Sequence, residues 1–264
     1  MKMKTRYSIN AIVGMQLCLL LTDCSGQETV VGTEESQSLI DTLSVYSSAR
    51  LTFYYTSIDR DSIQAIARYV EASYERIVAD LKPESLTTIR ISLYSTLMDV
   101  HRAIGWPDAP SWVKGSATGI NEIRMISPAS TDLDATVTYD YMLSCLVHEF
   151  THCISLHVNL RIANRPRWLW EAVAIYESRQ FVDPKKLEYL RNGHPPSLGD
   201  LSDINDTRIY QVGYTIMDYV VSTWGIEAVR ELIRSNADLV NTIHMNEGEF
   251  QEGWCNYVTD RYLK

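Results

Sequence analysis

The chain has 264 residues, of which 45% are hydrophobic, enough to bury a substantial core in one large domain or two small lobes. Its formal net charge is −9 at pH 7, and removal of the first 23 residues, which carry Lys2, Lys4 and Arg6, would make the remainder more acidic. Such a surface excludes the basic footprint that nucleic-acid binding requires, so we expect no nucleic acid as partner.

The N-terminus has the pattern of an export signal. Three basic residues precede a largely apolar run from Ile9 to Leu21, which is too short to span a bilayer comfortably. The pattern predicts a signal peptide over residues 1–23. The following "LLTDCSG" is similar to the cleavage box of bacterial lipoproteins, which implies lipidation of Cys24 and a place in the bacterial cell envelope, attached to the membrane through this lipid only. Asp23 departs from the small residue usual there, so ordinary signal-peptidase cleavage nearby is the alternative.

Residues 24–43 are polar and acidic without a sustained apolar period, which is typical of a flexible tether. The next part, residues 44–133, contains both strand and helix patterns. Apolar alternation predicts strands at 51–56, 89–95 and 122–127, and helical spacing predicts helices at 60–81 and 97–104.

From Asp134 onward nearly all of the sequence has helical patterns. Segments near 138–157, 168–180, 207–223, 226–234 and 248–262 are separated by Pro, Gly and Asn signals. Strands first and helices after predict an α+β fold: a small N-terminal lobe with a mixed sheet and helices (44–133), then a mostly helical lobe (134–264). We expect the two lobes to form one domain over 44–264.

The stretch "HEFTH" at 148–152 carries the chemistry. Each residue of an α-helix turns by about 100°, so His148, Glu149 and His152 project over one side. Two imidazoles at this spacing can bind one Zn²⁺ while the carboxylate reaches the attacking water. The motif occurs by chance in about one chain in a hundred of this size. Alone, it leaves open that three polar residues merely share a helix face.

A third ligand is available at a suitable distance. A catalytic zinc ion takes three protein ligands and keeps one open position. Glu171 follows His152 after 18 intervening residues, inside the segment predicted as a helix at 168–180 and after a turn containing proline. Two antiparallel helices joined by such a loop could direct Glu171 towards the two histidines.

This combination resembles a known family. HExxH, then 18 residues, then Glu171 within W-L-x-E-x-x-A-x-Y is similar to the gluzincin metallopeptidases, above all the aminopeptidase N and leukotriene A4 hydrolase family and the compact bacterial peptidase MA-like proteins. The resemblance implies a zincin-like fold and one zinc ion bound by His148, His152 and Glu171, with Glu149 as general base. Ala172 stands where the family usually has glycine, a departure that touches packing but no ligand.

The resemblance extends to two further elements. Tyr210 and Gly213 match a Y-x-x-G segment of this family, whose tyrosine hydroxyl donates a hydrogen bond to the oxyanion. Two alternatives remain for this role: Tyr214 could be the donor, or Tyr210 could be a purely structural tyrosine. In gluzincins an edge strand before the metal helix pairs with the substrate backbone, and "GINEIRMIS" at 119–127 occupies that place. We expect Glu122 there to be an exposed strand residue rather than an anchor for the substrate amine.

Other polar residues near the motif are expected to have structural roles. Cys145 is predicted to lie buried beneath the histidines, and Glu177 to lie on a solvated helix face rather than orient a histidine. Cys145 and Cys153 are about 12 Å apart along one helix, too far to bridge each other. We expect no disulfide framework.

The expected function is that of a monomeric, zinc-dependent peptidase acting on peptide or protein substrates by metal-activated water. Two alternatives remain: a non-catalytic peptide- or glycan-binding surface lipoprotein on the zincin scaffold, and a purely structural zinc ion. Glu149 disfavours the first, because a metal scaffold needs the two histidines and not the glutamate. Structural sites are usually closed by four ligands, often cysteines, which disfavours the second. Endopeptidase and aminopeptidase activity are both compatible with the sequence.

Overall fold

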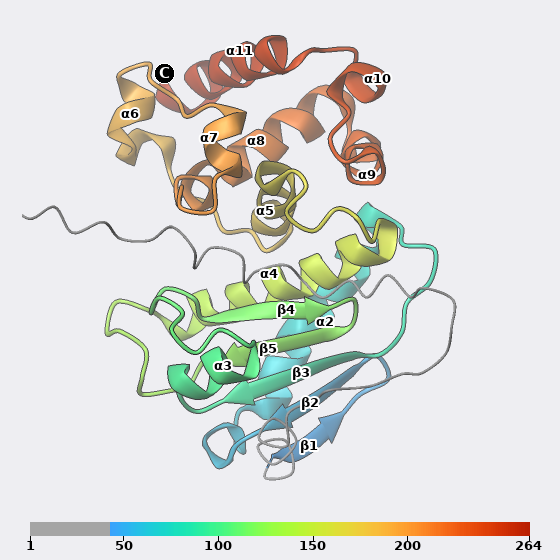
Figure 1. Ribbon diagram of the computed structural model, residues 1–264, viewed down its shortest axis with the longest axis vertical. Coiled ribbons are helices and arrows are strands. Elements are labelled where there is room, and N and C mark those ends of the chain that lie inside the picture. The colour runs from blue at the N-terminus through green and yellow to red at the C-terminus, as the bar shows by residue number, and fades with distance from the viewer. Residues whose placement is uncertain (1–42) are drawn as a thin grey trace, which may run out of the picture.

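The computed structural model describes residues 43–264 (Figure 1). The predicted signal peptide, Cys24 and nearly all of the tether lie outside these residues. Within them the chain has the α+β organisation expected, with a five-stranded mixed sheet first and helices after. None of the helices in this range combines the length and apolar character needed to cross a bilayer.

The sheet has the strand order β1-β2-β3-β5-β4, and its three central strands are parallel. The strands are β1 (Ser44–Ser47), β2 (Leu51–Tyr55), β3 (Ile89–Tyr94), β4 (Gly115–Gly119) and β5 (Glu122–Ile126). The outer strands β1 and β4 run antiparallel to their neighbours. Helix α2 (Ile63–Leu81) connects β2 to β3, and α3 (Leu97–Ala103) follows β3.

The structure corrects the expected edge strand. β5, which contains most of the stretch at 119–127, is paired on both sides, by β3 and by β4. The edge is formed by β4, whose sequence GSATG lacks an apolar alternation, so the sequence predicted no strand there. A tight turn at Ile120 and Asn121 folds β5 back along β4, so β5 becomes an inner strand.

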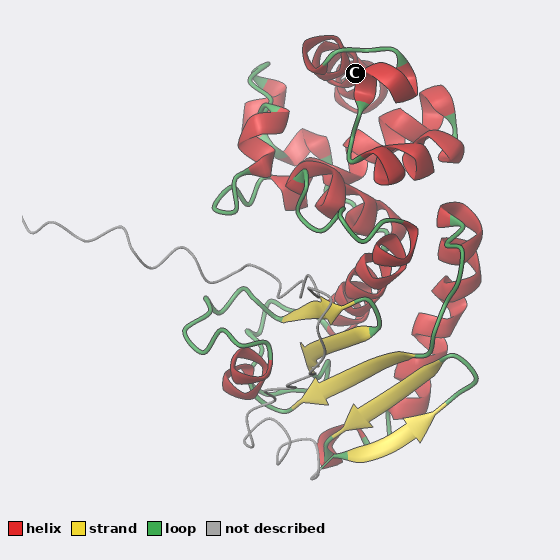
Figure 2. Cartoon of the chain, turned by 45° about the vertical axis from the view of Figure 1, so that its right-hand side comes forward, coloured by secondary structure: helices red, strands yellow, loops and turns green. Residues whose placement is uncertain are grey.

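The remaining chain is helical, and the helices that follow α4 stand at the end of the molecule opposite the sheet (Figure 2). Helix α4 lies between these two parts, against the sheet and α2 on one side and α5 on the other (Figure 1). The helices are α4 (Tyr139–Val158), α5 (Arg167–Glu177), α6 (Glu188–Arg191), α7 (Leu198–Ser202), α8 (Ile209–Trp224), α9 (Ile226–Ser235), α10 (Leu239–Ile243) and α11 (Glu247–Val258), with 3₁₀ turns at Ser57–Asp59 and Pro184–Lys186 and a π-helical turn at Thr259–Leu263.

Local sequence explains where the central helix begins and why it is apolar. The Thr138 side chain accepts a hydrogen bond from the Tyr141 backbone N–H at 3.1 Å, which caps the N-terminus of α4. Because α4 is covered on both sides, buried residues occur all round it, among them the consecutive Phe150, Thr151, His152 and Cys153. Its polar residues are therefore exceptions that require partners inside the molecule.

Gly213 of α8 packs directly against α5. A Cβ atom on Gly213 would lie 2.7 Å from Cδ1 of Ile175 and 3.1 Å from Cα of Ala172. We therefore expect the free energy of unfolding of Gly213→Ala to lie about 1–3 kcal/mol below that of Gly199→Ala, measured by denaturant titration. Gly199→Ala is the control because both variants gain the helix propensity of alanine, while the Cβ at position 199 would meet only Ser197 Oγ at 3.6 Å. Equal stability of the two variants would contradict this close contact.

Glu177, the last residue of α5, lies in the interior, and the prediction of a solvated face was wrong. Its side chain is 1% exposed and its carboxylate pairs with Arg76 of α2, whose guanidinium also donates to the Glu177 carbonyl oxygen. Burial raises the pKa of Glu177 to about 7, although Arg76 acts in the opposite direction. Helical periodicity could not identify this role, because Arg76 is 101 residues away in the sequence.

Candidate metal centre

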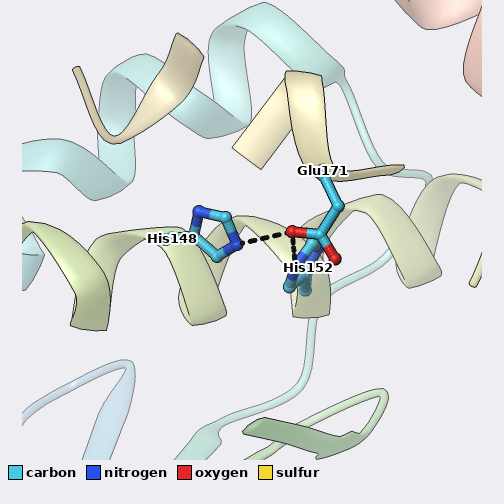
Figure 3. A group of neighbouring side chains, drawn as sticks. All are labelled: His148, His152 and Glu171. Atoms are coloured by element: carbon cyan, nitrogen blue, oxygen red, sulfur yellow. Dashed lines mark ion pairs between the residues drawn. The ribbon is translucent and has the colours of Figure 1, made fainter. Parts of the chain in front are cut away.

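Two histidines of α4 and one glutamate of α5 converge between the helices (Figure 3). His148 and His152 lie one turn apart, with ring centroids separated by 4.6 Å and ring planes at 89°. Glu171 reaches them from α5: its Oε2 atom lies 3.2 Å from His148 Nε2 and 3.9 Å from His152 Nε2. All three side chains are buried. The structure thus brings together the three residues that the sequence proposed as ligands.

The donor set could hold one metal ion. One ligand atom from each residue lies within 4.8 Å of the others. Donors around a tetrahedral ion at ordinary ligand distances are about 3.3 Å apart, close to the separations from Glu171 to the two imidazoles. Glu171 Oε2 is buried and has no satisfactory hydrogen bond within residues 43–264, although it faces two imidazole nitrogens. A cation between these atoms would satisfy it.

The protonation states of two of the residues suit metal binding. Burial, with the neighbouring His148, lowers the pKa of His152 to about 3, so its imidazole is neutral and has a free lone pair. Burial raises the pKa of Glu171, but its contacts with His148 and His152 outweigh burial and lower this pKa to about 2. Glu171 is therefore a carboxylate across the physiological range.

Gln180 holds the ring of His148. Gln180 Oε1 lies 3.0 Å from His148 Nδ1 and accepts the Nδ1 proton, which leaves Nε2 as the ring nitrogen that faces Glu171. Gln180 Nε2 donates in turn to Ser144 Oγ and Cys145 Sγ, both at 3.4 Å. The sequence placed Gln180 inside a helix ending at 180. The helix ends at Glu177 because Arg179 adopts a left-handed backbone (φ 60°), which allows Gln180 to reach His148.

We expect Gln180→Ala to weaken metal binding by about 10–100-fold, as removal of a ligand's hydrogen-bond partner commonly does. Competition with a fluorescent chelator would measure the affinity. Gln180→Glu retains an acceptor for the Nδ1 proton and should therefore keep most of the metal affinity. Gln251→Ala serves as the control, since Gln251 bonds only the backbone of Pro196 and Leu198. Unchanged affinity in Gln180→Ala would show that packing alone orients His148.

Cys145 adjoins this network and does not join the ligand group. The residue is partly exposed, whereas the sequence predicted a buried residue beneath the histidines. Burial of the thiol itself raises its pKa to about 12, so it remains protonated. Cys145, Cys153 and Cys255 are all free, in agreement with the expected lack of a disulfide framework within the described residues.

Glu149 lies next to the ligands and is held by the edge strand. Its Oε2 atom accepts a hydrogen bond from the Ala117 backbone N–H of β4 at 2.7 Å. Burial raises the pKa of Glu149, and Glu171 adds to this effect, while His148 and the Ala117 bond oppose it. A carboxylate with a raised pKa beside a candidate metal site has the properties of a general base. Sequence reasoning identified Glu149 but missed Ala117, because β4 was not predicted.

The structure places Tyr210 near the histidines. The Tyr210 ring centroid lies 6.4 Å from that of His148, and its hydroxyl lies 3.4 Å from Nη2 of Arg167. Tyr214, one turn later on α8, packs instead on Tyr176 and Phe181, with ring centroids at 5.1 and 5.2 Å. Of the two tyrosines proposed from the sequence, Tyr210 is therefore the one that lies beside the candidate metal ligands.

Two neighbouring side chains complete the surroundings. Trp170 stacks on His152, with ring centroids 4.0 Å apart and planes at 7°. Glu122 of β5 pairs with Arg124, whose Nη2 lies 3.2 Å from Glu122 Oε1. An already paired carboxylate gives no support to an amine-anchor role for Glu122.

Comparison with protein-family models finds no match for this chain, and a search of curated proteins finds no match either.

Proposed function

We propose that the protein is a zinc-dependent peptidase with a zincin-like fold, similar to the gluzincins. The observation that carries the proposal is the buried convergence of His148, His152 and Glu171, with Glu149 beside them. Two nitrogens and one oxygen are a donor set that zinc accepts in catalytic sites with an open position. When bound, zinc would supply Lewis acidity, which lowers the pKa of water and polarises a carbonyl group.

The chain's own residues would divide the remaining work. Glu149 takes the proton of the attacking water and passes it to the leaving amine, for which its raised pKa suits it. The Ala117 N–H fixes one carboxylate oxygen of Glu149 and leaves the other available for this transfer. The Tyr210 hydroxyl donates a hydrogen bond to the oxyanion that develops from the peptide carbonyl.

The edge strand β4 is the element on which an extended peptide would bind. One side of β4 pairs with β5, and its other side has no strand neighbour within the described sheet. An added strand would form main-chain hydrogen bonds along an edge that also holds Glu149 in place. We propose β4 in place of β5, the strand expected from the sequence, because β5 is interior to the sheet.

The function is tested with a peptide library containing both blocked and free N-termini, incubated with the mature protein, alongside elemental analysis of its metal content. We expect about one zinc ion per chain. Internal cleavage of blocked peptides would identify an endopeptidase, and cleavage of free ends alone an aminopeptidase. A zinc-loaded protein that cleaves no peptide would overturn the proposal in favour of a binding lipoprotein.

Export and lipidation at Cys24 also belong to the proposal and rest on the N-terminal pattern alone. Mass spectrometry of the mature N-terminus would detect a lipidated cysteine. A mature chain that begins at another residue without lipid would exclude it.

A further inference from the structure

Arg167, the first residue of α5, is a buried cation one helical turn before Glu171. It is 2% exposed, and three backbone carbonyls surround its Nη1 atom: Leu201 at 3.2 Å, Asp203 at 3.0 Å and Asp206 at 3.2 Å. Carbonyl dipoles compensate a buried charge less completely than a carboxylate does, so burying a guanidinium in this way is costly. The contact made by its second terminal nitrogen, Nη2, suggests a function for this arginine.

The second terminal nitrogen of Arg167 points to Tyr210. Nη2 lies 3.4 Å from the Tyr210 hydroxyl, and the guanidinium carbon lies 5.5 Å from the ring centroid. A guanidinium only donates, so the phenol oxygen must be the acceptor. The proton of the hydroxyl therefore cannot point towards Arg167 and is available for another acceptor. The Tyr210 ring also neighbours His148, with ring centroids 6.4 Å apart.

We propose that Arg167 is a positioning residue for the hydrolysis proposed above: it orients the Tyr210 hydroxyl towards the oxyanion and places a positive charge behind it. This inference rests on the proposed function. The competing explanation is purely structural, since Arg167 also ties the segment 201–206 to α5. The two explanations differ in one respect. A positioning role requires Tyr210, whereas a structural tie does not.

A double-mutant cycle separates them. With the zinc-loaded mature protein and a blocked peptide substrate, Tyr210→Phe should lower kcat by about 100-fold, the usual effect of losing one oxyanion donor. Arg167→Met should lower kcat by about 10-fold and leave KM within about 2-fold. In the Tyr210→Phe background, Arg167→Met should lower kcat by less than about 2-fold, because the two residues act together. Arg167→Lys, which keeps the charge and a donor, should recover part of kcat.

Arg230 offers a matched control. This arginine of α9 is 8% exposed and donates from Nε to the Asp80 carbonyl oxygen at 2.6 Å. Arg230→Met should reduce stability while kcat and the effect of Tyr210→Phe stay unchanged. If Arg167→Met lowers kcat by the same factor with and without the Tyr210 hydroxyl, Arg167 is a structural tie and the inference is overturned.

A spectroscopic readout does not depend on activity. The ¹³Cζ resonance of Tyr210 at neutral pH, assigned by its loss in Tyr210→Phe, reports hydrogen bonding at the phenol oxygen. We expect it to shift in Arg167→Met and not in Arg230→Met. An unshifted resonance would overturn the inference. A shifted resonance in a zinc-loaded protein that cleaves no peptide would instead overturn the proposed function, and with it the catalytic purpose of this contact.

Discussion

Replacement of Glu149 by glutamine is expected to lower kcat for peptide hydrolysis by about 10²–10⁴-fold while the metal content stays at the wild-type level. The amide is nearly isosteric and can still accept the hydrogen bond from the Ala117 N–H, so β4 and the helix should remain in place. It cannot take a proton from water, which is the role assigned to the carboxylate. Steady-state kinetics and elemental analysis of the same preparation would measure both effects.

Glu122→Gln is the matched control for this experiment. Glu122 belongs to β5, and its carboxylate pairs with Arg124. We expect kcat of this variant to remain close to that of the wild type. Two results would contradict the role of Glu149. Full activity of Glu149→Gln would show that another group acts as the base, and loss of the metal would make Glu149 a ligand.

Replacement of Glu171 by alanine should weaken metal binding by more than about 100-fold, because even second-sphere partners of a metal commonly contribute 10–100-fold. Glu171 is the only anionic member of the three-residue group and faces both imidazoles. A ligand that binds only the folded chain stabilises it by about 2.7 kcal/mol at a hundred times its Kd. A chelator should therefore lower the Tm of the wild type and leave the Tm of Glu171→Ala unchanged.

The same helix provides the control. Glu177 is the other buried glutamate of α5 and pairs with Arg76 instead of facing the histidines. Glu177→Gln should lower stability yet retain the metal and the response to the chelator. Undiminished metal content in Glu171→Ala would remove Glu171 from the ligand set.

Features that depend on residues close together in the sequence could be predicted from it. The helix of His148 and His152 and the strand at 89–95 follow from apolar periodicity, which local burial imposes. The direction of the two imidazoles follows from helix geometry alone. Glu171 could be proposed because its distance from His152 and the surrounding pattern resemble those of the gluzincins.

Features that depend on distant partners were not visible. β4 consists of small and polar residues, and only its pairing with β5 makes it a strand. The contact between Ala117 and Glu149 was hidden for the same reason. Gln180 reaches His148 only because the backbone turns at Arg179, and no pattern of residues predicts this left-handed conformation. The helices α6, α7 and α10, of four to five residues, are too short to show a period.

The pairing of Arg76 with Glu177 limits how short a fragment of this chain could keep the proposed activity. Every side chain assigned to the candidate centre as a ligand or reactive group lies after Asp134, so a fragment of residues 134–264 would contain all of these side chains. It would lack Arg76, and the carboxylate of Glu177 would be left uncompensated at the end of the helix that carries Glu171. It would also lack the Ala117 N–H that fixes Glu149. Helix α2 and the sheet are therefore as necessary to the proposed activity as the helices that carry the candidate ligands.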